Sequence, residues 1–148
     1  MEMEQDFSEL LASFNAQRVE YLIVGAWAVA LHGRPRYTSD LDVLVRPERE
    51  NAARVVAALD ALGFESSGLG EDIFVQPDQQ VQLGVEPVLI NLLTSIAGVS
   101  WEEAELGSET CRFGEVPARF IGRNQLVASK RASGSLQDLA DLTALGEA

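Results

Sequence analysis

Apolar residues recur at the helical period in two long segments of the chain. In residues 7–19 they lie three or four residues apart and predict an amphipathic helix. A second segment with the same spacing predicts a helix that Pro47 opens and Gly63 closes. Shorter helices are expected at residues 26–32, 124–132 and 135–145, and Ser100 with Glu103 forms an S-x-x-E capping box that starts another.

Short apolar runs at residues 21–24, 41–45 and 87–93 predict buried strands. We expect the strand at 41–45 to lie beside the other two. Strands and helices in this order predict an α+β fold with one mixed β-sheet flanked by helices. Two hairpins are also expected, one joining 73–75 to 81–83 through Pro77-Asp78 and one joining 111–113 to 116–120 through Gly114.

The bulk composition favours one ordinary globular unit in the cytoplasm. The 148 residues suit one domain, 1–148, with its core at about 21–145. No secretory signal or membrane-spanning run is visible, and the single cysteine, Cys111, excludes an internal disulfide. The net charge of −12 disfavours extended nucleic-acid binding, because the backbone of a nucleic acid is itself anionic.

Two carboxylates begin the predicted strand at 41–45. Asp40 and Asp42 are two residues apart, so both side chains should leave the same face of the strand. Two adjacent carboxylates repel each other unless a cation lies between them. Hard oxygen ligands of this kind suit Mg²⁺ or Mn²⁺, with phosphate oxygens completing the coordination. The pattern therefore predicts a divalent metal site at Asp40 and Asp42.

A glycine turn precedes this pair by 15 residues. Gly25 lies where a predicted strand passes into a helix, and helix N-termini attract phosphate. Glycine also lets the backbone approach a ligand closely. Arg34 and Arg36 lie between the two features and could bind triphosphate oxygens. A phosphate site followed by a metal site is the arrangement that a nucleoside triphosphate needs.

Each of these features has a plainer interpretation when taken alone. A lone D-x-D is usually a solvated strand end, and loop arginines often only neutralise nearby acids. Thr38 could serve the turn, and Lys130 could be an exposed helix lysine. It is the order and proximity of the glycine turn and the carboxylate pair that favour a functional site.

The segment GAWAVALHGRPRYTSDLDVLV resembles the first motif of the polymerase-beta-like nucleotidyltransferase superfamily. It is most similar to the small bacterial branch related to the abortive-infection nucleotidyltransferase toxins. The runs EPVLINLLTSIAGVSWEEA and ASKRASGSLQDLADL resemble later segments of that branch. The resemblance implies that Asp40 and Asp42 bind metal, and that Gly25, Ala26, Arg36, Thr38 and Lys130 bind the nucleotide.

The sequence departs from that pattern at two positions. Ala26 stands where the superfamily often has serine or glycine, so no hydroxyl can contact phosphate there. Asn91 occupies the place of the third catalytic carboxylate. An amide can offer its carbonyl oxygen to a metal, but it cannot accept a proton near neutral pH. Glu86 is of the wrong strand parity to replace it.

Two functions follow from this interpretation. The first is a Mg²⁺-dependent nucleotidyltransferase that moves a nucleoside monophosphate from an NTP to a hydroxyl of a protein, an RNA end or a small molecule. The alternative is a catalytically reduced module that binds a nucleotide, or a protein partner in a toxin–antitoxin type of regulation, because of Asn91. A dinucleotide-binding redox domain is disfavoured, since Gly25 lacks the further glycines of G-x-G-x-x-G.

Overall fold

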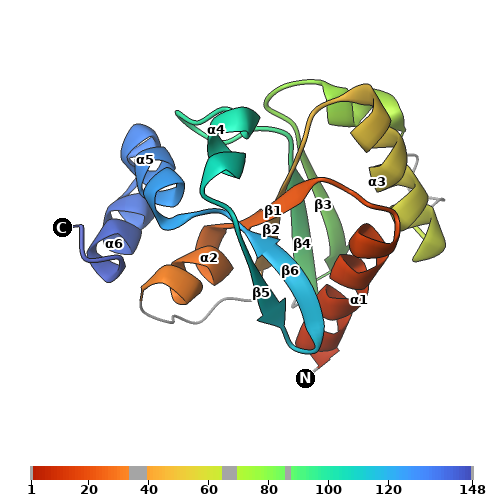
Figure 1. Cartoon of the computed structure of the whole chain (residues 1–148), viewed down its shortest axis with the longest axis horizontal. Coiled ribbons are helices and arrows are strands. Elements are labelled where there is room, and N and C mark those ends of the chain that lie inside the picture. The colour runs from red at the N-terminus through yellow and green to blue at the C-terminus, as the bar shows by residue number, and fades with distance from the viewer. Residues whose placement is uncertain (1, 34–39, 65–69, 86–87, 148) are drawn as a thin grey trace.

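The computed structural model describes residues 2–33, 40–64, 70–85 and 88–147. Its elements alternate between helices and strands in the first half of the chain, and two helices close it (Figure 1). In chain order they are α1 (Glu2–Ala16), β1 (Tyr21–Val24), α2 (Gly25–His32), β2 (Asp40–Val45), α3 (Arg49–Ala61), the 3₁₀ helix η2 (Glu71–Val75), β3 (Gln80–Val85), β4 (Val88–Leu93), α4 (Trp101–Leu106), β5 (Glu109–Phe113), β6 (Val116–Phe120), α5 (Arg123–Ser133) and α6 (Leu136–Ala144).

The strands form one six-stranded mixed sheet in the order β3-β4-β2-β1-β6-β5. β2 runs antiparallel to β1 and parallel to β4. The hairpin strand β3 is antiparallel to β4. On the other side of the sheet, β6 runs parallel to β1 and antiparallel to the edge strand β5. The expected α+β class is confirmed, and so is the position of β2 between β1 and β4.

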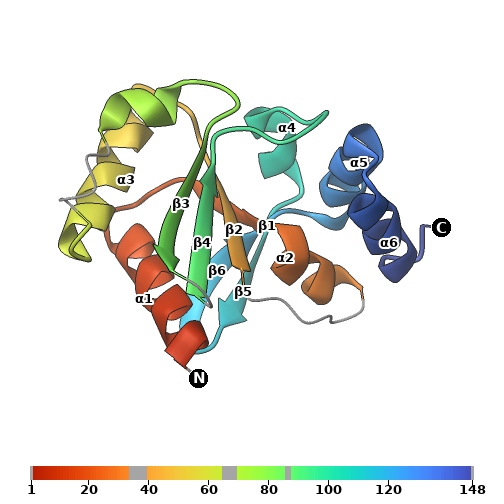
Figure 2. The ribbon, with the colours of Figure 1, turned by 180° about the vertical axis from the view of Figure 1, so that it is seen from behind.

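Helices lie on both sides of this sheet. Figures 1 and 2 show α1 and α3 together at one end of the molecule and α5 with α6 at the other, with α2 and α4 between. The apolar face of α1 is almost fully buried, which confirms the predicted helix, although it starts five residues earlier than the spacing indicated. Among the described residues, no helix is long and apolar enough to span a membrane.

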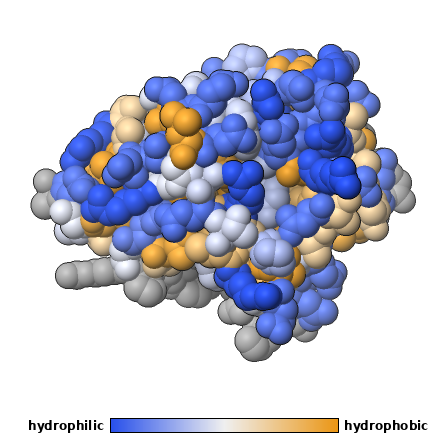
Figure 3. Space-filling view, viewed as in Figure 1, coloured by the Kyte–Doolittle hydropathy of each residue, from blue (hydrophilic) through white to orange (hydrophobic). Residues whose placement is uncertain are grey.

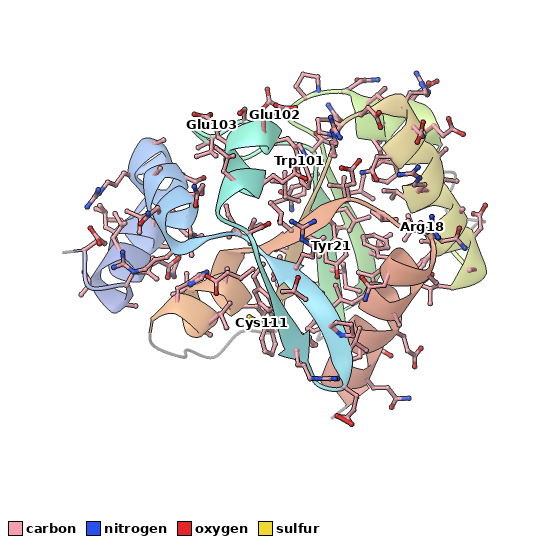
Figure 4. All side chains as sticks on the ribbon, in the orientation of Figure 1. Arg18, Tyr21, Trp101, Glu102, Glu103 and Cys111 are labelled. Atoms are coloured by element: carbon pink, nitrogen blue, oxygen red, sulfur yellow. The ribbon has the colours of Figure 1, made fainter. Side chains whose placement is uncertain are left out.

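Aromatic packing joins α1 and α2 to the β5–β6 hairpin. The ring of Trp27 lies 4.9 Å from that of Phe113 and 6.2 Å from that of Phe7, measured between centroids. Trp101 is 7% exposed and points from α4 towards the sheet, whereas Glu102 and Glu103 point away from it (Figure 4). Trp101 therefore packs in the core, and Trp27 packs against it while partly buried.

Helix ends follow the predicted capping in most places. Capping boxes are present at Ser100 and at Ser135. The expected start of α3 at Pro47 is wrong, because the helix begins at Arg49 after an N-cap at Glu48. The buried amide of Asn51 bonds the backbone of Glu20 and Arg46 and so ties the start of α3 to the end of β2.

The predicted strand at 73–75 is also wrong. Residues Glu71–Val75 form η2 instead, with two acidic residues in its first turn, where the helix dipole favours them. Phe74 is the one apolar residue of η2 that is fully buried. The segment therefore places a single side chain in the core and does not line a face of the sheet. The strand expected at 81–83 is present as β3, but its hairpin partner is β4 and not residues 73–75.

Most of the surface in Figure 3 is hydrophilic, with apolar side chains scattered over it. This matches the net charge of −12. Cys111 lies on the edge strand β5, half-buried, in the strand predicted for it (Figure 4).

Candidate functional site

The first residues of β2 present alternating polar and apolar side chains. Asp40 and Asp42 are half-buried, whereas Leu41 and Val43 are fully buried. Because side chains alternate across a strand, the two carboxylates share the face opposite the core. This is the arrangement that the D-x-D spacing predicted.

The pairing of β2 with β4 places Asn91 directly opposite Asp42. The Nδ2 of Asn91 donates a hydrogen bond of 2.8 Å to the Oδ1 of Asp42. Asn91 is 6% exposed, so this bond is shielded from solvent. The sequence predicted that these side chains would converge, and the structure brings Asp42 and Asn91 together. Their roles in binding or catalysis stay predictions.

Gly25 makes room for the carboxylate of Asp42. Its φ is +69°, a backbone conformation that favours glycine. A Cβ atom added at Gly25 would lie 2.2 Å from the Oδ2 of Asp42, well inside contact distance. The sequence suggested that this glycine allows a phosphate to approach. The geometry adds that the glycine is needed for the position of Asp42 itself. Ala26 follows it, buried in the first turn of α2.

A cleft of about 240 Å³ opens beside this pair. Gly25 and Asp42 line one side of it, and Lys130 and Asp138 from the two C-terminal helices line the other. Residues from three distant parts of the sequence thus share one cavity. A larger cavity of about 430 Å³ lies at the opposite end of β2, beside Arg46 and Trp101, and none of the predicted site residues lines it.

Lys130 is held by two carboxylates. Its Nζ lies 3.1 Å from Asp138 Oδ1 and 3.0 Å from Asp141 Oδ2. The Lys130 side chain is 15% exposed and that of Asp141 only 1%, so the three charges form a largely buried network. Lys130 therefore faces the cleft as part of a cluster with a formal charge of −1. The sequence did not reveal this role of Asp141.

Asp138 also caps α6. Its Oδ2 accepts a hydrogen bond of 2.7 Å from the Ser135 hydroxyl, and its backbone N–H donates a hydrogen bond of 3.1 Å to Ser135 Oγ. Burial raises the pKa of Asp138, but hydrogen bonds from Ser133, Ser135 and Lys130 outweigh it and lower the pKa from 3.8 to about 2. The carboxylate is thus stabilised in its ionised form.

Several predicted residues lie outside the described part of the chain. These are Arg34, Arg36, Thr38 and Glu86. Within the described part, no group of three or more His, Cys, Asp or Glu side chains could hold a metal ion. The oxygen donors on this face of β2 are the carboxylates of Asp40 and Asp42, and the amide nitrogen of Asn91 faces Asp42.

Gly25→Ala should distort the site. The introduced methyl group would collide with Asp42 and force a left-handed backbone onto alanine. Gly63→Ala is the matched control, since Gly63 also has a positive φ of +91° but nothing within 4 Å of the added Cβ. We expect Gly25→Ala to lower the free energy of unfolding by about 1–3 kcal/mol more than Gly63→Ala, measured in urea. Equal losses would contradict the packing of Asp42 on Gly25.

Asp138→Asn should change how stability depends on pH. A carboxylate whose pKa is depressed stabilises the fold above its unfolded pKa, and this stabilisation is lost as pH falls through the folded pKa of about 2. The wild type should exceed the variant by about 2 kcal/mol at pH 5, and the difference should shrink between about pH 4 and pH 2. Urea unfolding across this range measures it. A difference that does not vary with pH would refute the assignment.

Comparison with known families and structures places the chain among nucleotidyltransferases. The profile of the aminoglycoside-2''-adenylyltransferase family matches residues 6–105, about two thirds of the chain. No curated protein sequence gives a match.

Solved structures share the fold at low sequence identity. A protein from Thermotoga maritima described as a nucleotidyltransferase has a TM-score of 0.60 at 11% identity, covering 97% of this chain and 89% of that one. An antigenic nucleotidyltransferase-like protein from Paracoccidioides brasiliensis has a TM-score of 0.58 at 12% identity, covering 98% and 74%. The antibiotic-resistance factor ANT(2'')-Ia has a TM-score of 0.57 at 15% identity, covering 96% and 81%.

These matches agree with the predicted superfamily and with the observed mixed sheet. The resemblance to the abortive-infection branch stays a prediction. The extent of the profile match decides the family: the chain belongs to the aminoglycoside-2''-adenylyltransferase family, within the polymerase-beta-like nucleotidyltransferases.

Proposed function

We propose that this protein, as one domain, is a Mg²⁺-dependent nucleotidyltransferase that moves a nucleoside monophosphate from an NTP to a hydroxyl of a small molecule. The observation that carries the proposal is the cleft in which Gly25 and Asp42 face Lys130, in a chain of this family. The hydroxyl oxygen would attack the α-phosphorus, and the bond to pyrophosphate would break. Nucleotidyl transfer itself follows from the family.

The donor set suits a divalent cation. Asp40 and Asp42 offer hard carboxylate oxygens on one strand face, and Gly25 lets Asp42 Oδ2 take its position there. A bound Mg²⁺ would neutralise phosphate charge and polarise the phosphorus. The side chains of Asp40 and Asp42 would hold it, and we expect Gly25, Ala26, Arg36, Thr38 and Lys130 to contact the triphosphate.

The charge of the chain favours a cationic acceptor. The net charge is −12, and the cluster of Lys130, Asp138 and Asp141 adds a formal charge of −1 to the cleft. Such a surface repels an RNA end and attracts amines. The name of the matched family gives an aminoglycoside, an amino sugar, as the acceptor. A crystal structure of ANT(2'')-Ia contains adenylyl-2''-tobramycin. We therefore place an amino-sugar hydroxyl ahead of a protein or RNA acceptor.

A nucleotide with Mg²⁺ should stabilise the protein. Ligand at 100 times its Kd raises the free energy of unfolding by about 2.7 kcal/mol. A thermal-shift panel of the four NTPs with Mg²⁺ measures this. Asp42→Asn should lose the shift, whereas the matched control Asp60→Asn, on the exposed side of α3, should keep it. If no NTP shifts the Tm at concentrations well above a millimolar Kd, that result would count against the proposal.

Asn91 favours a second function, that of a nucleotide-binding or toxin–antitoxin-type regulatory module. Its amide donates to Asp42 and cannot take the proton of an attacking hydroxyl. That proton would have to pass to a carboxylate of the pair or to water. Turnover of labelled NTP by the wild-type protein would exclude this second function.

Asn91→Asp should raise transfer activity if a base is what the site lacks. A general base contributes about 10²–10⁴-fold, which sets the expected gain in kcat. A carboxylate at the 2.8 Å contact with Asp42 would also be repelled unless a cation lies between them. Mg²⁺ should therefore raise the Tm of Asn91→Asp more than that of the wild type.

Adding Asp42→Asn to the Asn91→Asp variant is the control, and it should abolish both gains. If Asn91→Asp still binds nucleotide but transfers no faster than wild type, the second function is favoured. If the wild type is already fully active, another residue serves as the base.

A further inference from the structure

A row of hydrogen-bonded polar side chains crosses three strands at the level of Asp42. In the sheet, Asn91 on β4 pairs with Asp42 on one side and with Gln82 on β3 on the other. The Nε2 of Gln82 lies 3.2 Å from the Oδ1 of Asn91, and the Nε2 of Gln80 lies 3.4 Å from the same atom. Asn91 is thus held from both sides.

The charge of Asp42 fixes the direction of every bond in this row. An ionised carboxylate can only accept, so the atom of Asn91 that lies 2.8 Å from it must be the amide nitrogen. The oxygen of Asn91 must then face β3, where it needs donors. Gln82 and Gln80 supply them through their amide nitrogens. The two glutamines therefore support the orientation that Asp42 requires.

We propose that Gln82, assisted by Gln80, is a positioning residue that turns the nitrogen of Asn91 towards Asp42. Asn91 is then a hydrogen-bond donor to the carboxylate pair and not a third oxygen ligand for a cation. Its N–H group contacts Asp42 Oδ1, while Oδ2 lies beside Gly25. The orientation of Asn91 concerns the same site as the proposed function. Its expected effect, on a cation held by two carboxylates, rests on that proposed function.

The glutamines are suited to this role by their place in the fold. Both are exposed on the edge strand β3, whereas Asn91 is buried. A substitution at Gln82 should therefore leave the fold intact while it changes the partner of a buried amide. Orienting partners of this kind typically alter metal affinity by about 10–100-fold.

Gln82→Glu is the variant that tests the orientation. The introduced carboxylate can only accept, so it competes with Asp42 for the nitrogen of Asn91. In the metal-free wild type, we expect NMR cross-peaks from the Asn91 amide protons to the β-protons of Asp42. In Gln82→Glu, cross-peaks to the side chain at position 82 should appear. Wild-type amide protons that contact Gln82 instead would overturn the proposal.

Mn²⁺ binding, measured by calorimetry, tests the consequence. Turning the oxygen of Asn91 towards the cation should lower the Kd of Gln82→Glu for Mn²⁺ by about tenfold. The added charge alone is controlled by Gln76→Glu, also exposed but outside β3, and by Gln82→Glu in an Asn91→Ala background. Neither control should change the Kd by more than about twofold, because salt screens exposed charges. Equal tightening with and without Asn91 would overturn the proposal.

The two experiments separate this inference from the proposed function. The cross-peaks are measured without metal or nucleotide, so they decide the orientation of Asn91 in any case. A wild type that binds neither Mn²⁺ nor Mn²⁺ with NTP would contradict the proposed function, while the expected cross-peaks would still support Gln82 as the positioning residue.

Discussion

The site depends on the parallel pairing of β2 with β4. This pairing sets Asp42 opposite Asn91 and makes a hydrogen bond between them possible. A one-residue slip would turn Asn91 to the other face of the sheet, because side chains alternate along a strand. The fully buried Leu41 and Val43 on the core face resist such a slip, since it would expose them. Core packing therefore fixes the geometry of the polar face.

Among the described residues, the basic side chain that lines the cleft is already paired with acids. Lys130, the single lysine of the chain, is shared between Asp138 and Asp141. Removing one member of such a buried network leaves the others uncompensated, so the network serves stability as well as any ligand. A triphosphate at this cleft would rely on its own cation more than on Lys130. In the proposed function, the two carboxylates on β2 would hold that cation.

Periodicity and turn chemistry predicted much of the fold, since these signals are local. The helix predicted at residues 7–19, observed at 2–16, and the capping box at Ser100 came from such signals. The strand expected at residues 73–75 failed because a short apolar run does not distinguish a strand from a 3₁₀ turn that buries one phenylalanine.

For the site, the sequence could predict the shared face of Asp40 and Asp42 and the convergence with Asn91. It could not predict that Gln82 and Gln80 contact Asn91, because the strand at 81–83 was expected to pair with residues 73–75 and not with β4. The alternation in QVQLGV did carry a signal for a polar face. Asp141 was missed because a helix pattern does not tell which acid meets Lys130.

One replacement, an amide for a carboxylate, changes the chemistry of the site more than its shape. The two side chains are nearly the same size, so an amide fits at position 91, where the resemblance to the superfamily leads us to expect an acid. An acid there would need a cation or a proton to lie beside Asp42, whereas the amide satisfies Asp42 directly through its N–H group. The protein can therefore fold with this site empty and uncharged at position 91. The amide that relieves this repulsion cannot accept a proton. In the proposed enzyme, stability without metal and catalytic power are therefore opposed at this one side chain.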